Sequence, residues 1–273
     1  MILSMTNSKY SLPKHATFLF NHCNVTSDVI AGLTYNQHPV PLLLDGVSEL
    51  HKNLFKILSG IDEADQRHEV FEKYMNAHFQ LNNLSEMGQS DDLAFNRKKI
   101  NYKRIILGWH LNPNGLEAAV LKRWVESRFG LSPRFHIHKI RNHEDPAYQD
   151  FLIEAAVGMY NTNAIEAQLD VLYSYTQYEL SLLSETHLSL YRGFNLLNDH
   201  EVIDKNRKKL ILLLNNINSF SKTEEVAENF GDYVISVCAP RYKVFCFSKI
   251  LPQQLNVEAE YMVLGGLYEA TLI

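Results

Sequence analysis

The sequence predicts an α+β protein in which a helical N-terminal part packs on a β-rich C-terminal part. Between residues 46 and 185, apolar side chains recur at the three- and four-residue spacing of amphipathic helices. From about residue 187 the spacing changes to the two-residue alternation that is typical of β-strands. We therefore expect an irregular segment over residues 1–45, a helical region over residues 46–185 and a β-rich region over residues 186–273.

The composition is that of an ordinary soluble globular protein. The length of 273 residues is enough for one large domain or two modest ones. The hydrophobic share of 46% and the charged share of 21% are ordinary for this class of protein. A net charge of −5 without a long basic run argues against nucleic-acid binding. Three cysteines without a Cys-x-x-Cys pair predict no disulfide framework and no zinc site, and they fit a reducing cytoplasm. No run of 18 apolar residues and no export signal occur, so we expect no membrane span.

Six helices are expected in the helical region. Asp145 and Pro146 have the residue types of a helix N-cap and first turn, and Gly130 ends the preceding helix. The last helix is the most periodic, and we expect its Tyr173, Tyr175 and Tyr178 to pack in and around the core. The expected helices cover residues 47–58, 64–79, 96–109, 116–129, 145–158 and 163–183.

A short strand is expected over residues 134–138, where polar and apolar side chains alternate. His136 and His138 lie two residues apart there, so they share a side of the strand and could hold a metal ion. No carboxylate or cysteine partner is apparent in the sequence. We therefore expect ordinary surface histidines and no bound metal.

The β-rich region contains five expected strands and one helix. Its strands are bounded by polar and glycine-containing segments. The strands are expected over residues 187–194, 209–214, 233–238, 242–247 and 261–272, and the helix over residues 222–230.

The first of three short motifs in this region is Arg192-Gly193, at or near a strand end. A guanidinium in such a place suits a phosphate, which it can bind through two hydrogen bonds. The glycine allows the backbone to approach a ligand closely. The alternative is an exposed arginine followed by a turn glycine.

The second motif is Ser219-Phe220-Ser221. Ser221 and Glu224 have the spacing of a capping box, so we expect Ser221 to cap the helix that follows. Ser219 has no such structural explanation. It could project into a cleft and form a hydrogen bond with a carboxylate or a ribose.

The third motif is Glu258-x-Glu260. In an extended chain both carboxylates point to the same side. Two neighbouring carboxylates are costly unless positive charge lies between them. The pair therefore suits a sugar cation together with a guanidinium, and the alternative is a solvated strand edge.

In this order the three motifs resemble those of arginine-specific mono-ADP-ribosyltransferases of the Arg-Ser-Glu class. Nearly the whole chain, apart from its first 30 residues, resembles the dinitrogenase reductase ADP-ribosyltransferase family of nitrogen-fixing bacteria. Long sequence blocks outside the three motifs carry this second resemblance. They are residues 38–41, 44–47, 122–131, 160–170 and 230–233.

The resemblance implies a β-sandwich ADP-ribosyltransferase core and a function in the bacterial cytoplasm. The family transfers ADP-ribose from NAD to an arginine of dinitrogenase reductase, the iron protein of nitrogenase, and this blocks nitrogen fixation. NAD is then a co-substrate, and no metal is needed. The resemblance also implies that the ADP-bound reductase is the protein substrate and that PII-type signalling proteins are regulators.

The resemblance further assigns roles to the donor-side residues. Glu260 would stabilise the sugar cation through the ribose 2′-hydroxyl, and Ser219 would hold Glu260 in place. Arg192 would clamp the NAD pyrophosphate, while the Gly193 backbone would reach the nicotinamide amide. Phe220 would stack on the nicotinamide, a role that Phe230 shares as a candidate although we expect Phe230 to pack.

On the acceptor side, the resemblance implies that Glu258 holds the incoming arginine and takes its proton. The helical region would recognise the acceptor and serve as scaffold. Its basic helix, residues 122–128, would meet an acidic surface of the reductase, or it would serve framework packing alone. Two alternatives to the whole function stay open, namely transfer to an arginine of another protein and a non-catalytic helical regulatory protein.

Overall fold

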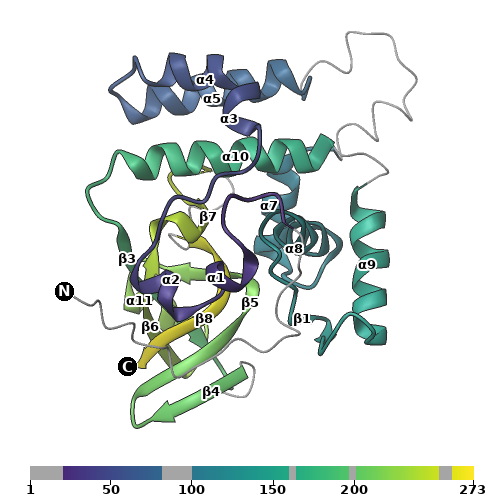
Figure 1. Cartoon of the computed structure of the whole chain (residues 1–273), viewed down its shortest axis with the longest axis vertical. Coiled ribbons are helices and arrows are strands. Elements are labelled where there is room, and N and C mark those ends of the chain that lie inside the picture. The colour runs from purple at the N-terminus through teal and green to yellow at the C-terminus, as the bar shows by residue number, and fades with distance from the viewer. Residues whose placement is uncertain (1–20, 82–99, 160–163, 197–200, 252–259) are drawn as a thin grey trace, which may run out of the picture.

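The computed structural model describes residues 21–81, 100–159, 164–196, 201–251 and 260–273. Both helices and an extended antiparallel sheet are present, so the α+β class is confirmed (Figure 1). None of the helices in these described ranges is long and apolar enough to cross a membrane.

The helices agree with the sequence pattern wherever that pattern is long. The expected helices at 64–79, 116–129, 145–158 and 163–183 are confirmed within two residues at each end. The described helices are α1 (Ser27–Ile30), α2 (Leu33–Gln37), α3 (Val47–Leu50), α4 (Lys52–Leu58), α5 (Ala64–His78), α7 (Tyr102–Leu111), α8 (Leu116–Phe129), α9 (Pro146–Met159), α10 (Ala164–Ser181) and α11 (Glu224–Glu228).

Local hydrogen bonds explain several helix ends. The Asp145 side chain accepts a hydrogen bond from the backbone N–H of Ala147 at 3.1 Å, which confirms the N-cap expected for α9. Gly130 follows α8 with a φ of 66°, a left-handed conformation that favours glycine. Asn101 caps α7 through the N–H of Lys103 at 2.9 Å. Helix α7 therefore begins later than expected, and residues 96–99 of the prediction lie outside the described residues.

Two expectations for the N-terminal half were wrong. The expected helix over residues 47–58 is divided at His51, whose ring nitrogen Nδ1 lies 2.7 Å from the Tyr74 hydroxyl. Residues 21–45 contain the short helices α1 and α2, although the whole segment was expected to be irregular. These helices of four and five residues are too short to show a period. The N–H of Leu267 donates to the Ala31 carbonyl at 2.8 Å, which joins this segment to the sheet.

The main sheet has six antiparallel strands in the order β4-β5-β3-β6-β8-β7, with an additional β5–β8 pairing. The strand β4 was not expected, and β5 continues through Ser221 rather than ending at residue 214. The start expected for β7 is a short 3-10 helix over Arg241–Lys243 instead. The strands are β3 (His187–Phe194), β4 (Glu201–Asn206), β5 (Lys209–Ser221), β6 (Tyr233–Pro240), β7 (Val244–Phe247) and β8 (Glu260–Leu272).

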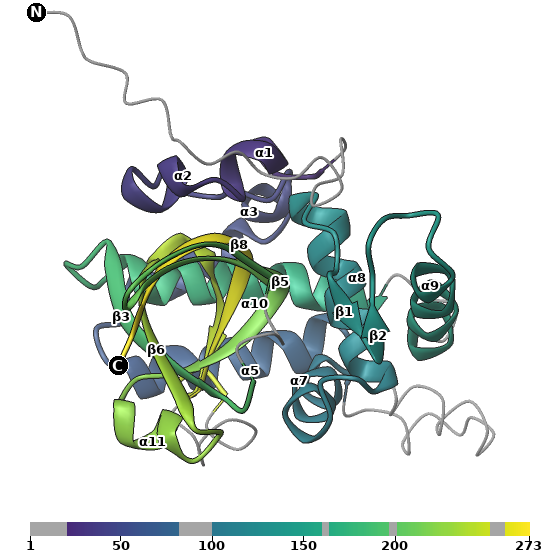
Figure 2. The same cartoon turned by 90° about the horizontal axis from the view of Figure 1, so that it is seen from below.

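Four of these strands close into a ring. β5 pairs with β8 from Lys209↔Thr271 to Ser221↔Glu260. The C-terminal end of β8 also pairs with β6, from Val237↔Ala270 to Ile235↔Leu272. β6 pairs with β3 along its whole length, and β3 returns to β5 at Tyr191↔Ser221. Figure 2 shows the strong curvature of these strands. Ring closure places the end of β5, the start of β8 and the second half of β3 next to one another.

Helix α10 lies between α5 and the sheet (Figure 1). Its Tyr173 hydroxyl donates to the Tyr242 carbonyl at 2.8 Å, and the Gln177 amide donates to the Val244 carbonyl at 2.7 Å. On the opposite side the Tyr175 ring stacks on Phe71 with centroids 4.0 Å apart. Tyr173 and Tyr175 are buried, as expected for packing residues.

Two of the three basic residues of α8, Lys122 and Arg128, are used inside the fold, whereas the Arg123 side chain is 37% exposed. Lys122 is 1% exposed and donates to the carbonyls of Pro113 and Phe135 at 2.7 and 3.0 Å. Arg128 donates to both oxygens of Asp170, at 2.7 and 3.0 Å. Neither side chain is available to an acidic partner surface, so framework packing describes Lys122 and Arg128.

We predict that Asp170→Ala destabilises the protein by about 2–3 kcal/mol. Asp170 also accepts the Trp124 indole N–H at 2.7 Å, so its loss leaves the buried indole without this acceptor and Arg128 with Glu166 as its carboxylate partner. The free energy of unfolding, measured by urea denaturation followed by circular dichroism, tests this. Glu69→Ala is the control, since its ion pair with Lys73 is exposed and its loss should have no measurable effect. Equal stabilities of the two variants would contradict the prediction.

Candidate active site

The candidate site is built around the carboxylate of Glu260, the first residue of β8. Glu260 is 2% exposed, and a buried carboxylate needs hydrogen-bond donors. Ser219 on β5 pairs with Met262, so Glu260 is the diagonal neighbour of Ser219 on the same face of the sheet. The Ser219 hydroxyl donates a hydrogen bond to Glu260 Oε1. The sequence prediction that Ser219 holds a carboxylate is therefore matched by a direct contact.

Helix α7 contributes two further contacts to the same carboxylate. The indole nitrogen of Trp109 lies 3.0 Å from Ser219 Oγ and 3.3 Å from Glu260 Oε1. His110 Nδ1 lies 3.2 Å from Glu260 Oε2. Three side chains therefore surround Glu260, one from the sheet and two from the end of a helix.

The sequence interpretation missed these two residues as site residues. Trp109 is a buried side chain of its helix, at 4% exposure. A buried indole N–H normally has a hydrogen-bond partner, and this was the one available signal. The partner lies 151 residues away in sequence, so no local pattern could have identified it.

Arg192 lies on β3, next to the carboxylate cluster. Its guanidinium donates to the Ser219 carbonyl at 2.6 Å and lies 6.0 Å from the centre of the Phe220 ring. Its Nε is buried and has no hydrogen-bond partner in the described part of the chain. Burial lowers the pKa of Arg192, and the nearby carboxylate of Glu260 opposes this shift. The structure thus brings together Arg192, Ser219 and Glu260, as the motifs predicted, and leaves a guanidinium N–H for an acceptor.

Gly193 has a clear packing reason. A Cβ added at Gly193 would lie 2.0 Å from the Ala227 carbonyl oxygen and 3.2 Å from the Phe230 side chain. Only a glycine allows β3 to approach α11 so closely. This packing explains the glycine, and the close approach of a ligand to its backbone stays a prediction.

Two expectations near α11 need correction, those for Ser221 and Phe230. Ser221 does not cap the helix, because it ends β5 in a buried position and α11 begins only at Glu224 without any side-chain cap. Phe220 is 2% exposed and lies against Arg192, so in this structure its ring is covered. Phe230, expected to pack, is 43% exposed. Glu258 lies outside the described residues.

The two histidines predicted as surface residues have different environments. They flank Ile137, whose φ of 58° turns the chain between β1 (Phe135–His136) and β2 (His138–Lys139). His138 is exposed, as expected, but His136 is 3% exposed. The Nε2 of His136 lies 2.7 Å from Glu154, and its Nδ1 lies 3.2 Å from the Lys122 ammonium. A carboxylate partner therefore exists that the sequence did not reveal.

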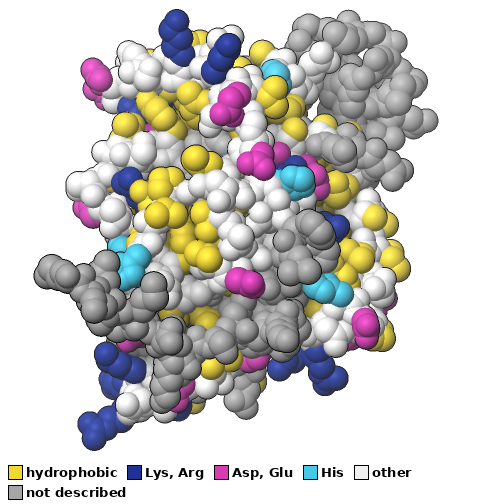
Figure 3. Space-filling model, in the orientation of Figure 1, with side chains coloured by type: hydrophobic (Ala, Val, Ile, Leu, Met, Phe, Trp, Pro, Cys, Tyr) yellow, Lys and Arg dark blue, Asp and Glu magenta, His cyan; other side chains and the backbone are white. Residues whose placement is uncertain are grey.

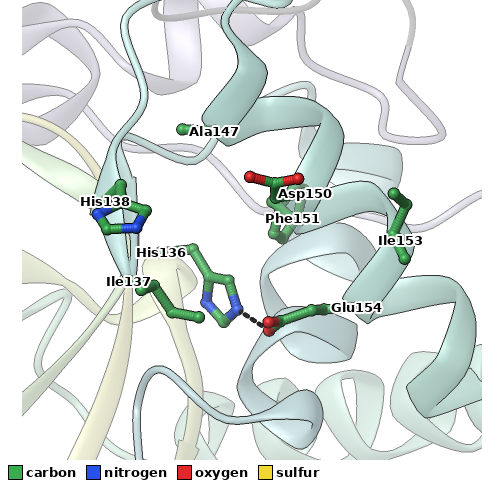
Figure 4. A pocket seen from close by; sticks show the side chains of 8 residues that line it. All are labelled: His136, Ile137, His138, Ala147, Asp150, Phe151, Ile153 and Glu154. Carbon is green, nitrogen blue, oxygen red and sulfur yellow. Dashed lines mark hydrogen bonds and ion pairs between the residues drawn. The ribbon is translucent and has the colours of Figure 1, made fainter.

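His136 and Glu154 line a hollow of about 260 Å³ between this hairpin and α9 (Figure 4). Hydrophobic side chains gather along α9 on the surface, where Ile153 is 63% exposed (Figure 3).

Burial lowers the pKa of Lys122 to about 7 and also lowers that of His136. Among the described residues, no group of three His, Cys, Asp or Glu side chains is arranged to hold a metal ion.

Comparison with known proteins decides the family. The family model of dinitrogenase reductase ADP-ribosyltransferase (DRAT) matches residues 20–272. The chain belongs to the dinitrogenase reductase ADP-ribosyltransferase family. It is 34% identical over 256 residues to the NAD(+)--dinitrogen-reductase ADP-D-ribosyltransferase of Rhodospirillum rubrum, covering 91% of this chain and 92% of that protein. No solved structure matches the chain.

The dinitrogenase reductase ADP-ribosyltransferase family predicted from the sequence blocks is therefore confirmed. Its match includes α7 as well as the strands that carry Arg192, Ser219 and Glu260. Every described contact to Glu260 thus lies within the matched residues.

We predict that Ser219→Ala lowers the rate of NAD cleavage by about 10²-fold. The variant removes the hydroxyl that joins Glu260 Oε1 to the Trp109 indole, so the carboxylate loses its fixed position. Release of nicotinamide from labelled NAD measures the effect. Ser189→Ala, an exposed serine on the neighbouring strand β3, is the matched control and should keep the wild-type rate. A wild-type rate in Ser219→Ala would show that the hydroxyl does not position the carboxylate.

Proposed function

We propose that this protein transfers ADP-ribose from NAD to a specific arginine of dinitrogenase reductase, releases nicotinamide and thereby switches off nitrogen fixation. Membership of the family and the name of the Rhodospirillum rubrum relative support this proposal. The observation that carries it is the buried carboxylate of Glu260, held by Ser219 beside the guanidinium of Arg192. This is the charge arrangement that cleavage of NAD requires.

The donor side of the reaction depends on Glu260. Breaking the bond between nicotinamide and ribose leaves positive charge on the sugar, as in glycoside hydrolysis, while the bonding electrons leave with a neutral nicotinamide. The leaving group needs little help from an acid. The carboxylate of Glu260 stabilises the sugar cation and binds the ribose 2′-hydroxyl, and Ser219 keeps it in position. Such a fixed charge commonly contributes about 10²–10³ to the rate.

Binding of NAD depends on β3. The unpartnered Nε of Arg192 and the remaining N–H groups of its guanidinium suit the oxygens of the pyrophosphate. The centre of the Phe220 ring lies 6.0 Å from the Arg192 guanidinium, so Phe220 acts on NAD through Arg192. The backbone of Gly193 binds the nicotinamide amide. Phe230 is exposed beside Gly193, and it is better placed than Phe220 to stack on the nicotinamide.

The acceptor side depends on Glu258. A guanidinium has a pKa above roughly 12, so the acceptor arginine is protonated and a poor nucleophile. The carboxylate of Glu258 holds this arginine in line with the ribose and takes a proton as its nitrogen attacks. General base catalysis of this kind contributes about 10²–10⁴. The two carboxylates thus serve the two reacting partners.

The wider proposal concerns partners and domains. The substrate is the ADP-bound reductase, a PII-type signalling protein regulates the enzyme, and both meet it in the bacterial cytoplasm. Residues 186–273 form a β-sandwich catalytic core, residues 46–185 form the scaffold and the acceptor-binding region, and residues 1–45 precede them. The contacts of α10 with both the sheet and α5 support a scaffold role for the helical region.

We predict that incubating dinitrogenase reductase with this protein, NAD and ADP adds one ADP-ribose to one arginine of the reductase. Mass spectrometry of the intact reductase and of its peptides measures the number and the place of the modification. Omission of NAD is the control. Release of nicotinamide with an unmodified reductase would assign the activity to another acceptor, and the absence of both would contradict the enzyme function.

We predict different losses for the two carboxylates. Glu260→Gln should lose both arginine transfer and NAD hydrolysis, because the charge beside the sugar cation is removed. Glu258→Gln should lose transfer but keep part of the NAD hydrolysis, because water needs no help from a base that serves the guanidinium. Parallel assays of nicotinamide release with and without the reductase distinguish these outcomes. An equal loss of both activities in Glu258→Gln would refute the division of roles.

A further inference from the structure

In this structure the protein itself occupies both oxygens of the Glu260 carboxylate. Oε1 contacts Ser219 and Trp109, and Oε2 contacts His110 at 3.2 Å. A carboxylate has about four lone-pair positions, and the ribose hydroxyl of NAD needs one that it can reach. Glu260 is only 2% exposed. The ribose hydroxyl therefore competes with these described protein contacts for a buried carboxylate.

The three contacts are not equally easy to displace. Ser219 is fixed within the β5–β8 ladder. Trp109 is 4% exposed, shares its N–H between Ser219 and Glu260, and has the Lys122 ammonium 5.8 Å from the centre of its ring. Moving this large side chain would open the core. The contacts on Oε1 are therefore the permanent ones.

His110 is the contact that can leave. Its side chain is 16% exposed, whereas Trp109 is 4% exposed and Glu260 is 2% exposed. It lies in the last turn of α7, next to Leu111, which is 74% exposed. A change of side-chain rotamer would take the imidazole away from Oε2.

We propose that Trp109 is a positioning residue for Glu260 and that His110 is a displaceable donor, which holds Oε2 until the ribose 2′-hydroxyl of NAD replaces it. This inference rests on the proposed function, because it takes the ribose of NAD as the ligand of Glu260. On binding, the imidazole N–H is exchanged for the ribose O–H on Oε2. Ser219 and Trp109 keep their contacts to Oε1, so the carboxylate stays in the same place.

The exchange has a consequence for affinity. NAD binds only to the fraction of molecules in which His110 has left Oε2, so the apparent affinity is lower than the intrinsic affinity by that fraction. Removing His110 should therefore strengthen NAD binding. Removing the Trp109 N–H should weaken catalysis instead, because Glu260 then has less restraint during cleavage. The two neighbouring residues are thus expected to affect different kinetic constants.

The test measures kcat and KM for NAD by nicotinamide release, with ADP-bound dinitrogenase reductase in excess. Trp109→Phe should lower kcat about tenfold, the effect of losing about one hydrogen bond, and leave KM within about twofold. His110→Ala should lower KM about three- to tenfold and leave kcat within about twofold. His110→Asn, which keeps an N–H donor near the place of Nδ1, should restore the wild-type KM.

Two controls separate these effects from general damage. Trp124→Phe removes the indole N–H that binds Asp170, and His138→Ala removes an exposed imidazole, so both should keep the wild-type constants. Thermal melting of each variant identifies one that does not fold. If Trp109→Phe does not fold, the His110 variants still decide the exchange.

Three results would overturn the inference. They are unchanged constants in Trp109→Phe, an unchanged KM in His110→Ala, and a fall of kcat in His110→Ala at constant KM, which would make His110 catalytic.

Calorimetric titration with NAD alone gives a second readout, in which His110→Ala should bind NAD more tightly than wild type. If the wild-type protein releases no nicotinamide, the proposed function fails, and this titration still decides whether His110 competes with NAD.

Discussion

A buried carboxylate needs donors, and this requirement organises the candidate site. Glu260 is placed where three elements meet, with Ser219 on β5 and Trp109 and His110 on α7 around it. An ionised carboxylate without these partners would cost several kcal/mol in the protein interior. The register of β5 on β8 and the position of α7 must therefore both be maintained for the charge to stay buried. Arg192 adds positive potential from β3.

The same requirement governs the framework around the site. Lys122, on the helix that packs beside Trp109, is buried among two carbonyls and His136. Lys243 is buried as well, with its ammonium 3.2 Å from the Gly265 carbonyl and 4.7 Å from the Tyr268 ring centre, and burial lowers its pKa to about 7. Backbone carbonyls and aromatic rings stabilise these two buried ammonium groups. Lys122 and Arg128 of α8 thus form interior contacts, although the sequence suggested that this basic helix could meet a partner surface.

Sequence patterns predicted the long elements and the chemistry-bearing residues, but not the contacts between them. The period of α8 and α10, the Asp145 cap and the Arg192, Ser219 and Glu260 motifs were all visible in short windows of sequence. The split at His51 and the helices α1 and α2 were not, because such short segments have no measurable period. The prediction for Ser221 was wrong because the Ser-x-x-Glu spacing of a capping box also occurs here, where Ser221 ends a strand. The contacts of Trp109 and His110 arise only when α7 is docked on the sheet, which no local pattern records.

The closed ring of β5, β3, β6 and β8 bears on how the protein folds. Ser219 and Glu260 are 41 residues apart and meet only after β5 and β8 have paired, while Trp109 is 151 residues from Glu260. Contacts between distant residues form slowly, because the entropy of closing the loop is lost before the contacts compensate for it. A partly folded chain therefore has no assembled carboxylate site. The chain becomes able to use NAD only at the end of folding, when ring closure and the docking of α7 are both complete.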